Sequence, residues 1–395
     1  MLLKPDAMTG HWEFTLGAAR VSALTAALPF PFLAHNVREA DFEDHIFEPH
    51  RMFTAGGVAV GVIGQAFPVT PIANPRWLVP AWRFGLRVDD IRKQVADVRA
   101  KGADLVVLLS HNGFDVDRKL AREVTDIDVI LSGHTHDAIP DVTRVGKTLI
   151  VASGSHGKFV SRLDLDVAAG RIRDFHYRLI PVFADAIASD AEVRAVVEAG
   201  RAPYARDLGR VLGRTAGLLY RRGTFTGTLD DVFCDAMLEE RDAEIALSPG
   251  FRWGTSLLPE TDITFEDVTN GCAITYPNCY RTTMSGARLK EVLEDVAHNI
   301  FHTDPYYQQG GDMVRTGGLG FAIDVAAPSG RRISEMTLLK SGRAIEPGKD
   351  YVVAGWASIA EDTRGPPIWD VVAAYLSRRQ TIAPKPSGAV KVVGG

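Results

Sequence analysis

Three histidines that follow two apolar segments are the strongest candidates for chemistry in this chain. His111 stands two residues after the apolar run 104–109, and His134 and His136 follow the apolar run 127–131 within Gly-His-Thr-His. Imidazole is the commonest metal ligand among side chains. Residues two apart in extended chain point the same way, so His134 and His136 can serve one metal centre or two adjacent ones.

The segments that carry these histidines are predicted as strand, helix and strand. The runs 104–109 and 127–131 are of the kind buried in parallel sheets, and a polar helix is predicted over 116–123 between them. Ligands of open α/β sheets collect outside the carboxyl ends of the strands. We therefore expect all three histidines in one crevice and favour a metal site over structural histidines that only hydrogen-bond their neighbours. Gly133 would let the backbone approach a bound ion.

The composition is that of an ordinary globular protein with two domains. The chain has 395 residues, 46% of them apolar and 24% charged, and a net charge of −5 that gives no sign of a nucleic-acid-binding surface. Its cysteines are too few for a disulfide framework, and whether Cys272 and Cys279 pair stays open. No apolar run has the length of a membrane span, and the first residues lack the apolar segment of a signal peptide.

An Ala- and charge-rich segment divides the chain. We expect a first domain over 1–184, a helical linker over 185–207 and a second domain over 208–395. Apolar periodicity predicts further elements. The helices are predicted over 15–27 with Thr15 as N-cap, 88–101, 229–241 and 285–302, and the strands over 32–34, 58–63, 148–152 and 159–167. The tail from Thr381 is expected to be loosely ordered.

Residues 64–85 contain four prolines and two tryptophans, Trp77 and Trp82, without periodicity. A functional lid and a packed surface loop explain this stretch equally well.

Two loops of the second domain combine arginine with glycine and aromatic residues. A guanidinium offers a planar fork of donors that suits a tetrahedral oxyanion. Ordinary turn chemistry with surface arginines is at least as good an explanation for either loop alone. The residues concerned are Arg252 in 248–254, and Tyr306, Tyr307, Asp312 and Arg315 in 304–318. A second histidine pair, His298 and His302, lacks a third ligand and is interpreted as a polar helix face.

The histidine motifs resemble those of a known enzyme superfamily. Ser-His-Asn-Gly at 110–113 and Gly-His-Thr-His at 133–136 resemble the calcineurin-like metallophosphatase domain in its 5′-nucleotidase branch. Within that branch the chain resembles most the thiosulfohydrolases of bacterial sulfur oxidation, the SoxB family. The phrases that carry this resemblance are GHWEFT at 10–15, IANPRWLVP at 72–80, SPGFRWG at 248–254 and DPYYQQGGDMVR at 304–315. The implied fold class is α/β (α+β overall), a metallophosphatase domain lacking its first strands followed by a 5′-nucleotidase-type C-terminal α+β domain.

The resemblance also implies a metal centre. His11, His111 and His134 would serve one divalent metal and His136 another, with Mn²⁺ expected and Zn²⁺ as the alternative. In nucleotidases the counterpart of GHWEFT carries an assisting histidine and an aspartate, where this chain has Trp12 and Thr15. This difference weakens the case for phosphate-ester hydrolysis.

The implied reaction is hydrolysis of a cysteine-S-thiosulfonate on a sulfur-carrier protein of SoxYZ type, whose cysteine lies on a C-terminal arm, with release of sulfate. Catalytic roles are expected for Arg252, Arg315 and Asp312, and substrate contacts for Trp12, Trp77, Tyr306 and Tyr307. The family is periplasmic. No nucleic-acid or membrane partner is expected.

The family pattern also requires an Asp-x-His strand and a Gly-Asp turn before GHWEFT, where this chain has nine residues. We therefore expect only part of the ligand set here. Two alternatives follow from the residues: a 5′-nucleotidase-type phosphoesterase, and a non-catalytic protein that binds the carrier.

Overall fold

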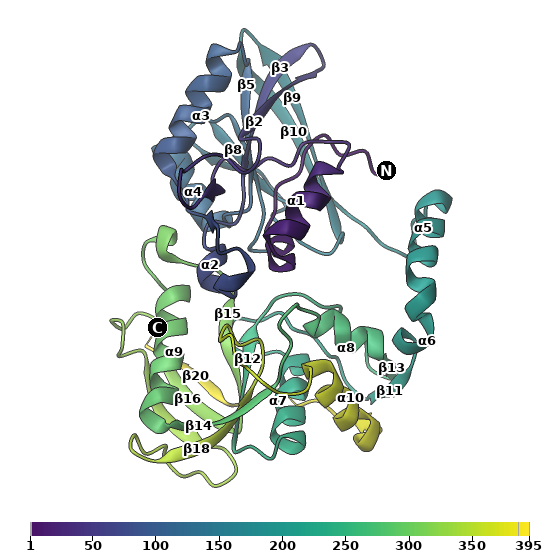
Figure 1. The fold of residues 1–395 in the computed structure, drawn as a ribbon, viewed down its shortest axis with the longest axis vertical. Helices are drawn as coiled ribbons and strands as arrows, with labels where there is room; N and C mark the ends of the chain where they lie inside the picture. Colours follow the sequence, from purple (N-terminus) through teal and green to yellow (C-terminus); the bar gives the residue numbers. More distant parts are fainter. Residues whose placement is uncertain (1, 386, 395) are drawn as a thin grey trace. The chain divides into compact units, whose positions relative to one another are not determined.

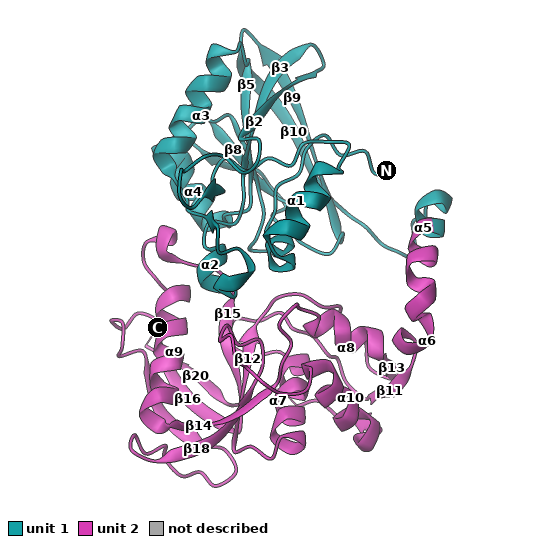
Figure 2. Ribbon diagram, in the orientation of Figure 1, with its two compact units in different colours: residues 1–195 teal, residues 196–395 magenta. Residues whose placement is uncertain are grey.

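A computed structural model describes residues 2–385 and 387–394. The chain forms two compact units, Met1–Ala195 and Val196–Gly395, which are described separately (Figure 2). The division falls within the stretch 185–207, where one long helix is predicted. That prediction is wrong in extent: the helix α5 covers Ala191–Arg201, and a 3-10 turn Ala202–Tyr204 separates it from the short α6, Ala205–Leu208. Pro203 lies in that turn and lacks the N–H that a continuous helix needs.

Unit 1 is built on a six-stranded sheet in the order β2-β3-β5-β6-β8-β7. Figure 1 labels β2, β3, β5 and β8 of this sheet. The four central strands are parallel, and the two edge strands run antiparallel to them. The central strands are apolar and largely buried, as the sequence predicts for a covered parallel sheet. The strands are β2 His50–Ala55, β3 Val58–Gln65, β5 Leu105–Ser110, β6 Val129–Ser132, β7 Thr143–Val145 and β8 Thr148–Ala152.

Two helices connect the central strands. α3, Val88–Ala100, follows β3 and buries Ile91, Val95 and Val98, while α4, Phe114–Glu123, joins β5 to β6. Their buried side chains form one hydrophobic core with those of the strands. The sequence predicts both helices to within two residues at each end. The apolar residues of α3 recur at helical spacing, and α4 is expected as the polar segment that joins two parallel strands.

The first residues of unit 1 differ from the prediction. Thr15 is not the N-cap of the first helix, because its hydroxyl donates to the Trp12 carbonyl (2.8 Å) inside a 3-10 turn, Trp12–Leu16. Gly17 then takes a φ of +87°, and α1 covers Ala18–Ala26. The strand predicted over 32–34 is reduced to isolated bridges.

The proline-rich stretch 64–85 contains regular pieces. It forms α2, Thr70–Ala73, a 3-10 turn Arg76–Leu78, and β4, Trp82–Arg83, which pairs with β1, Arg38–Glu39. Trp82 packs in a small hydrophobic cluster with Phe14 and Phe47, whereas Trp77 is 39% exposed. Unit 1 also contains a long hairpin of β9, Phe159–Ala168, and β10, Arg171–Pro181.

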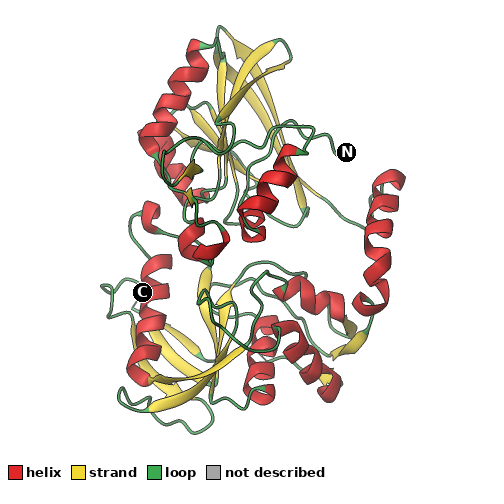
Figure 3. Cartoon of the chain, viewed as in Figure 1, coloured by secondary structure: helices red, strands yellow, loops and turns green. Residues whose placement is uncertain are grey.

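Unit 2 combines three small sheets with helices (Figure 3). Their orders are β14-β18-β12-β15, β17-β16-β20 and β13-β11-β19. The strands are β11 Val211–Thr215, β12 Ile245–Gly250, β13 Thr261–Thr264, β14 Tyr280–Ser285, β15 Asp312–Gly317, β16 Leu319–Asp324, β17 Ile333–Leu338, β18 Asp350–Gly355, β19 Thr381–Ile382 and β20 Val390–Val393.

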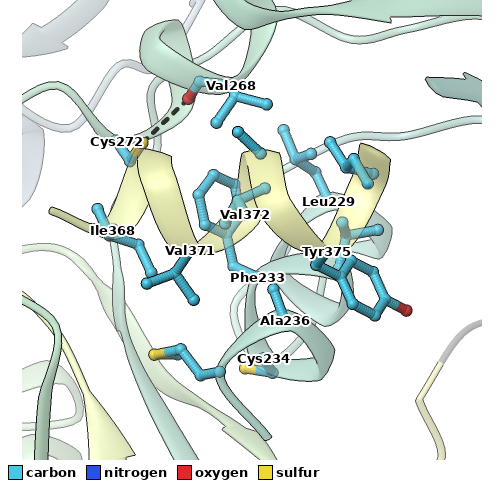
Figure 4. Close-up of a cluster of buried hydrophobic side chains, with 14 of the residues drawn as sticks. Leu229, Phe233, Cys234, Ala236, Val268, Cys272, Ile368, Val371, Val372 and Tyr375 are labelled. Atoms are coloured by element: carbon cyan, nitrogen blue, oxygen red, sulfur yellow. Dashed lines mark hydrogen bonds between the residues drawn. The ribbon is translucent and has the colours of Figure 1, made fainter. Parts of the chain in front are cut away.

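The helices of unit 2 are α7 Thr228–Glu240, α8 Phe265–Cys272, α9 Gly286–Ile300 and α10 Ile368–Arg379, with a 3-10 turn at Pro305–Tyr307. Figure 4 shows α7 and α10 packed through apolar side chains that include Phe233 and Val372. All three cysteines are buried and free, and the Cys272 thiol donates to the Val268 carbonyl at 3.1 Å. No helix in the part of the chain that the structure describes is long and apolar enough to cross a membrane.

The described part of the tail from Thr381 contains two short strands, which the prediction of a loosely ordered tail does not include. β19 adds to β11 and β20 adds to β16, both as parallel strands. These strands are two and four residues long, too short for a local pattern to reveal them, and their partners lie far away in the sequence.

Candidate metal centre

The two predicted histidine motifs lie side by side at the carboxyl edge of the unit 1 sheet. Ser110 and Ser132, the last residues of β5 and β6, are register partners. The backbone ladder continues past these strands, because His111 N–H donates to the Gln65 carbonyl and Gly133 N–H to the Ser110 carbonyl, each at 2.9 Å. The sheet edge therefore fixes the start of both turns, as the parallel strands predict.

Three imidazoles converge at this edge. One ring nitrogen from each of His11, His111 and His134 lies within 4.8 Å of the others. His11 Nδ1 is 3.2 Å from His111 Nε2. The Phe67 ring packs against His11 (centroids 4.1 Å apart) and stacks on His134 (4.2 Å). These contacts hold the imidazoles in a geometry that one cation could bridge.

Gly133 makes this approach possible. A Cβ atom added there would lie 3.1 Å from His111 Nδ1 and 3.3 Å from the Ser110 carbonyl oxygen. Any other residue would require His111 or the Ser110 carbonyl to shift by a few tenths of an ångström, so glycine is the residue that fits this close approach without adjustment. His134 and His136 adopt left-handed backbone conformations, with φ of +76° and +60°. Such conformations cost free energy in non-glycine residues and concentrate at functional sites.

His136 does not belong to the three-imidazole cluster. Its ring lies 5.9 Å from that of His156, edge to face, and its charge helps to lower the pKa of both His11 and His111. It therefore lies near the cluster and faces a second imidazole. In the sequence, His156 follows a predicted strand and has no defined set of partner residues, so the sequence predicts no role for it.

The environment of His11 and His111 keeps both rings neutral. Burial lowers the pKa of His11 well below its ordinary value, with smaller contributions from His134 and His111. Burial also lowers the pKa of His111 to about 4, and His136 contributes in the same direction. Neutral imidazole is the form that binds a metal ion, so this environment fits the metal that the donor set implies.

The lowered pKa values predict how cation binding depends on pH. An imidazole with the ordinary pKa of about 6.5 loses roughly tenfold in affinity at pH 5.5, because protons compete with the metal. His11 and His111 should escape this competition until the pH falls towards 4. Protonation of His11 and His111 should therefore add little to the pH dependence, and the Kd of Co²⁺, titrated by visible absorption from about pH 7.5 to about 5.5, should rise by no more than the roughly tenfold that a single ordinary imidazole costs. A rise of about a hundredfold or more, as competition at two or three ordinary imidazoles would give, would contradict this prediction.

Asp117 is a functional candidate that the sequence prediction missed. It lies on α4, fully buried, where burial raises its pKa to about 6 and the donors Ser132, Ser110 and Asn112 lower it. The signal was present in the sequence. Position 117 falls one turn before Leu120 and Ala121, on the apolar face of the helix, where a carboxylate is unusual.

The predicted residues of unit 2 form an alternating chain of charges. Asp230 on α7 accepts hydrogen bonds from Arg221 Nε (2.8 Å) and Arg315 Nε (3.2 Å), and Arg315 Nη2 donates to Asp312 (3.1 Å). Arg252 Nε lies 3.6 Å from Asp312. Arg221, Asp230 and Arg315 are buried. Arg315 is thus enclosed between the carboxylates of Asp230 and Asp312, a position that supports the structure of the site. Catalytic roles for Arg252, Arg315 and Asp312 stay predictions.

Of the aromatic residues predicted to contact the substrate, Trp12 lies at the histidine cluster and the two tyrosines lie in a turn of unit 2. The Trp12 ring lies 5.3 Å from that of His11, beside the three imidazoles. Tyr307 is 68% exposed and lies 4.9 Å from the His302 ring, while Tyr306 is half-buried in the same turn. Contact of these side chains, and of Trp77, with a substrate stays a prediction.

Comparison with known proteins identifies the family. The solved structure of sulfate thiohydrolase SoxB from Thermus thermophilus, in complex with glycerol, superimposes on all of this chain and 74% of its own with a TM-score of 0.96 and 36% identical residues. The chain belongs to the SoxB family. The resemblance found in the sequence is therefore confirmed.

Other relatives place the SoxB family within the 5′-nucleotidase superfamily. The family described as 5′-nucleotidase, C-terminal domain, matches residues 211–372. A 5′-nucleotidase precursor, also from Thermus thermophilus, shares the fold, with a TM-score of 0.85 and 21% identity over 100% of this chain and 84% of its own. Apyrase from Anopheles gambiae is 25% identical over 96% of this chain and 74% of its length. The predicted fold class is confirmed, and the chain is a hydrolase of the metallophosphoesterase type.

Proposed function

We propose that this chain is a thiosulfohydrolase that releases sulfate from a cysteine-S-thiosulfonate on a sulfur-carrier protein. The observation that carries the proposal is the likeness to sulfate thiohydrolase SoxB, which extends over the whole chain at 36% identity. The convergence of three imidazoles, two of which burial keeps neutral, supports it, because hydrolysis in this superfamily needs a metal-activated water. The periplasm and a carrier of SoxYZ type are part of this proposal.

The metal would be held by residues of unit 1. His11, His111 and His134 provide three nitrogen ligands for one ion, and His136 is proposed to serve a second. We expect Mn²⁺, with Zn²⁺ as the alternative. When bound, such an ion supplies Lewis-acid polarisation and lowers the pKa of a water molecule. The imidazoles themselves position the ion, and Phe67, which is 2% exposed, excludes water from their rings.

The proposed reaction consumes one water. A bond forms between the water oxygen and the terminal sulfone sulfur, and the bond from that sulfur to the neighbouring sulfur breaks. Sulfate leaves with one proton of the water, the other proton goes to the sulfur that was attached to the sulfone group, and the carrier cysteine keeps that sulfur as a persulfide. The guanidinium group of an arginine suits recognition of the sulfonate oxygens. We propose Arg252 for that contact, the arginine of unit 2 whose Nε lies 3.6 Å from Asp312.

Two local features weigh against nucleotide hydrolysis. Positions 12 and 15 hold tryptophan and threonine, so they offer no histidine–carboxylate pair to assist a leaving group. Thr15 is also buried, and its hydroxyl donates to the Trp12 carbonyl. In unit 2, Phe251 stacks on Trp253 with centroids 3.9 Å apart and meets Trp356 edge to face at 5.5 Å. These rings pack against one another, which leaves Phe251 poorly suited to stack on a base.

Sulfate release tests the proposal. The full chain, supplied with Mn²⁺, should release sulfate from a carrier loaded with a cysteine-S-thiosulfonate, detected by ion chromatography. His111→Ala should remove this activity because it deletes one of the three nitrogen ligands. Phosphate release from AMP without sulfate release would establish the nucleotidase alternative instead. Binding of the loaded carrier without release of either product would establish a non-catalytic binding protein.

A further inference from the structure

A single buried carboxylate ties together the two turns that carry the metal-site histidines. Asp117 Oδ1 accepts hydrogen bonds from Ser110 Oγ (2.8 Å) and Asn112 Nδ2 (3.0 Å), and its Oδ2 accepts one from Ser132 Oγ (2.6 Å). These three donors come from two different strand ends. Asp117 itself comes from α4, the helix that connects those strands.

The donors flank the proposed ligands in the sequence. Ser110 and Asn112 are the residues on either side of His111, and Ser132 precedes His134 by two residues. Ser110 and Ser132 face each other as register partners at the ends of β5 and β6. A shift of the Asp117 carboxylate would therefore move both histidine turns at once.

The bonding continues beyond Asp117 into the next strand. Asn112 Oδ1 accepts a hydrogen bond from Gln65 Nε2 (2.9 Å), and Gln65 Oε1 accepts one from His35 Nε2. Gln65, His35 and Asn112 are all buried. The network thus connects the ends of β3, β5 and β6 beside the histidine cluster.

Stability alone does not explain this choice of residue. Position 117 lies on the apolar face of α4, among Val116, Leu120 and Ala121, where an aliphatic side chain would pack without the cost of burying a charge. A buried carboxylate with three donors instead fixes geometry, because each donor must keep its distance and direction or be left unsatisfied. The feature that it fixes is the pair of histidine turns.

We propose that Asp117 is a positioning residue of the metal centre: through Ser110, Asn112 and Ser132 it holds the ends of β5 and β6 so that His111 and His134 face one cation. The inference rests on the metal-binding part of the proposed function and is independent of the substrate. It assigns Asp117 no contact with the cation or with reacting atoms.

Cobalt binding to the full chain tests this role. Substitutions of residues that orient metal ligands cost about 10–100-fold in metal affinity, and Asp117→Ala should raise the Kd of Co²⁺ by that amount and alter the visible absorption bands of the bound ion. Asp117→Asn keeps the shape and one acceptor oxygen and should restore much of the affinity. Asp115→Ala is the matched control, because Asp115 lies on the same helix with its side chain 60% exposed. It should leave both the Kd and the spectrum unchanged.

Ser132→Ala is a second test, needed in case Asp117→Ala does not fold. This small change removes only the hydrogen bond between Ser132 on β6 and Asp117, and it should weaken Co²⁺ binding less than Asp117→Ala does. Should Asp117→Ala fail to fold, a wild-type Kd and spectrum in Ser132→Ala would overturn the inference. The same values in a folded Asp117→Ala would also overturn it, even with a lowered Tm. If the wild-type chain binds no Co²⁺, the positioning role of Asp117 is refuted, because there is then no metal centre to position.

These readouts are separate from those of the proposed reaction. Because Co²⁺ is titrated without a carrier or a nucleotide, the positioning role can hold even when no sulfate is released. Conversely, sulfate release with normal Co²⁺ binding in the Asp117 variants would leave the thiosulfohydrolase proposal intact and refute only the role of Asp117.

Discussion

Replacing His111 by alanine should abolish tight binding of a divalent cation to this chain. His111 contributes one of the three imidazoles of the cluster, with its Nε2 3.2 Å from His11 Nδ1, and its own backbone N–H continues the sheet ladder by donating to the Gln65 carbonyl. Loss of a ligand should cost more than the about 10–100-fold that substitutions of ligand-orienting residues cost. Isothermal titration with Mn²⁺ and with Zn²⁺ would measure the loss.

The matched control for this prediction is His176→Ala. His176 is an exposed histidine of the same unit, on β10, where its ring accepts a hydrogen bond from Arg178. Its removal should leave the cation affinity unchanged. Equal affinities for His111→Ala and the wild type would mean that the three imidazoles do not form the metal site.

Replacing Asp230 by asparagine should strongly destabilise unit 2. The side chains of Arg221, Asp230 and Arg315 are 2%, 1% and 2% exposed, so Arg221 depends on this carboxylate for its charge balance, and Arg315 depends on it together with Asp312. Breaking a buried ion pair by removing one partner costs about 3–5 kcal/mol, because an uncompensated charge remains buried. We expect this decrease in the free energy of unfolding, measured by urea denaturation with far-UV circular dichroism.

A surface pair of the same unit provides the comparison. Asp262 lies 3.8 Å from Arg214, and both side chains are at least half exposed. Surface ion pairs contribute roughly 0–1 kcal/mol, so Asp262→Asn should stay within that range. Similar losses for the two variants would show that Asp230 is not essential to the buried network.

The sequence predicts the sheet edge of unit 1 well because its signals are local. Continuous apolar runs mark β5 and β6, and the parallel-strand rule places His111 and His134 together without further information. His11 carries no such signal. It precedes a 3-10 turn rather than following a strand, and only the resemblance to the SoxB family identifies it as a ligand.

The supporting residues could not be predicted because their partners are distant in sequence. Arg315 and Asp230 are separated by 85 positions, and no local pattern indicates that they meet. Asp117 bonds to residues 5 to 15 positions away, yet the interaction depends on the register of two strands that only the folded sheet defines. The helix start predicted at Thr15 is wrong because the Thr15 hydroxyl bonds within its own turn instead of capping the helix.

The parallel strands β19 and β20 also govern the order in which the chain can fold during synthesis. β11 pairs with residues 381–382 and β16 with residues 390–393, so one sheet of unit 2 stays incomplete until Ile382 has left the ribosome and another until Val393 has. Unit 1, which forms a compact unit within the first 195 residues, can fold while unit 2 is still being translated. The nascent chain therefore exposes the unpaired edges of β11 and β16 throughout that interval, and chaperones that shield strand edges should associate with it then.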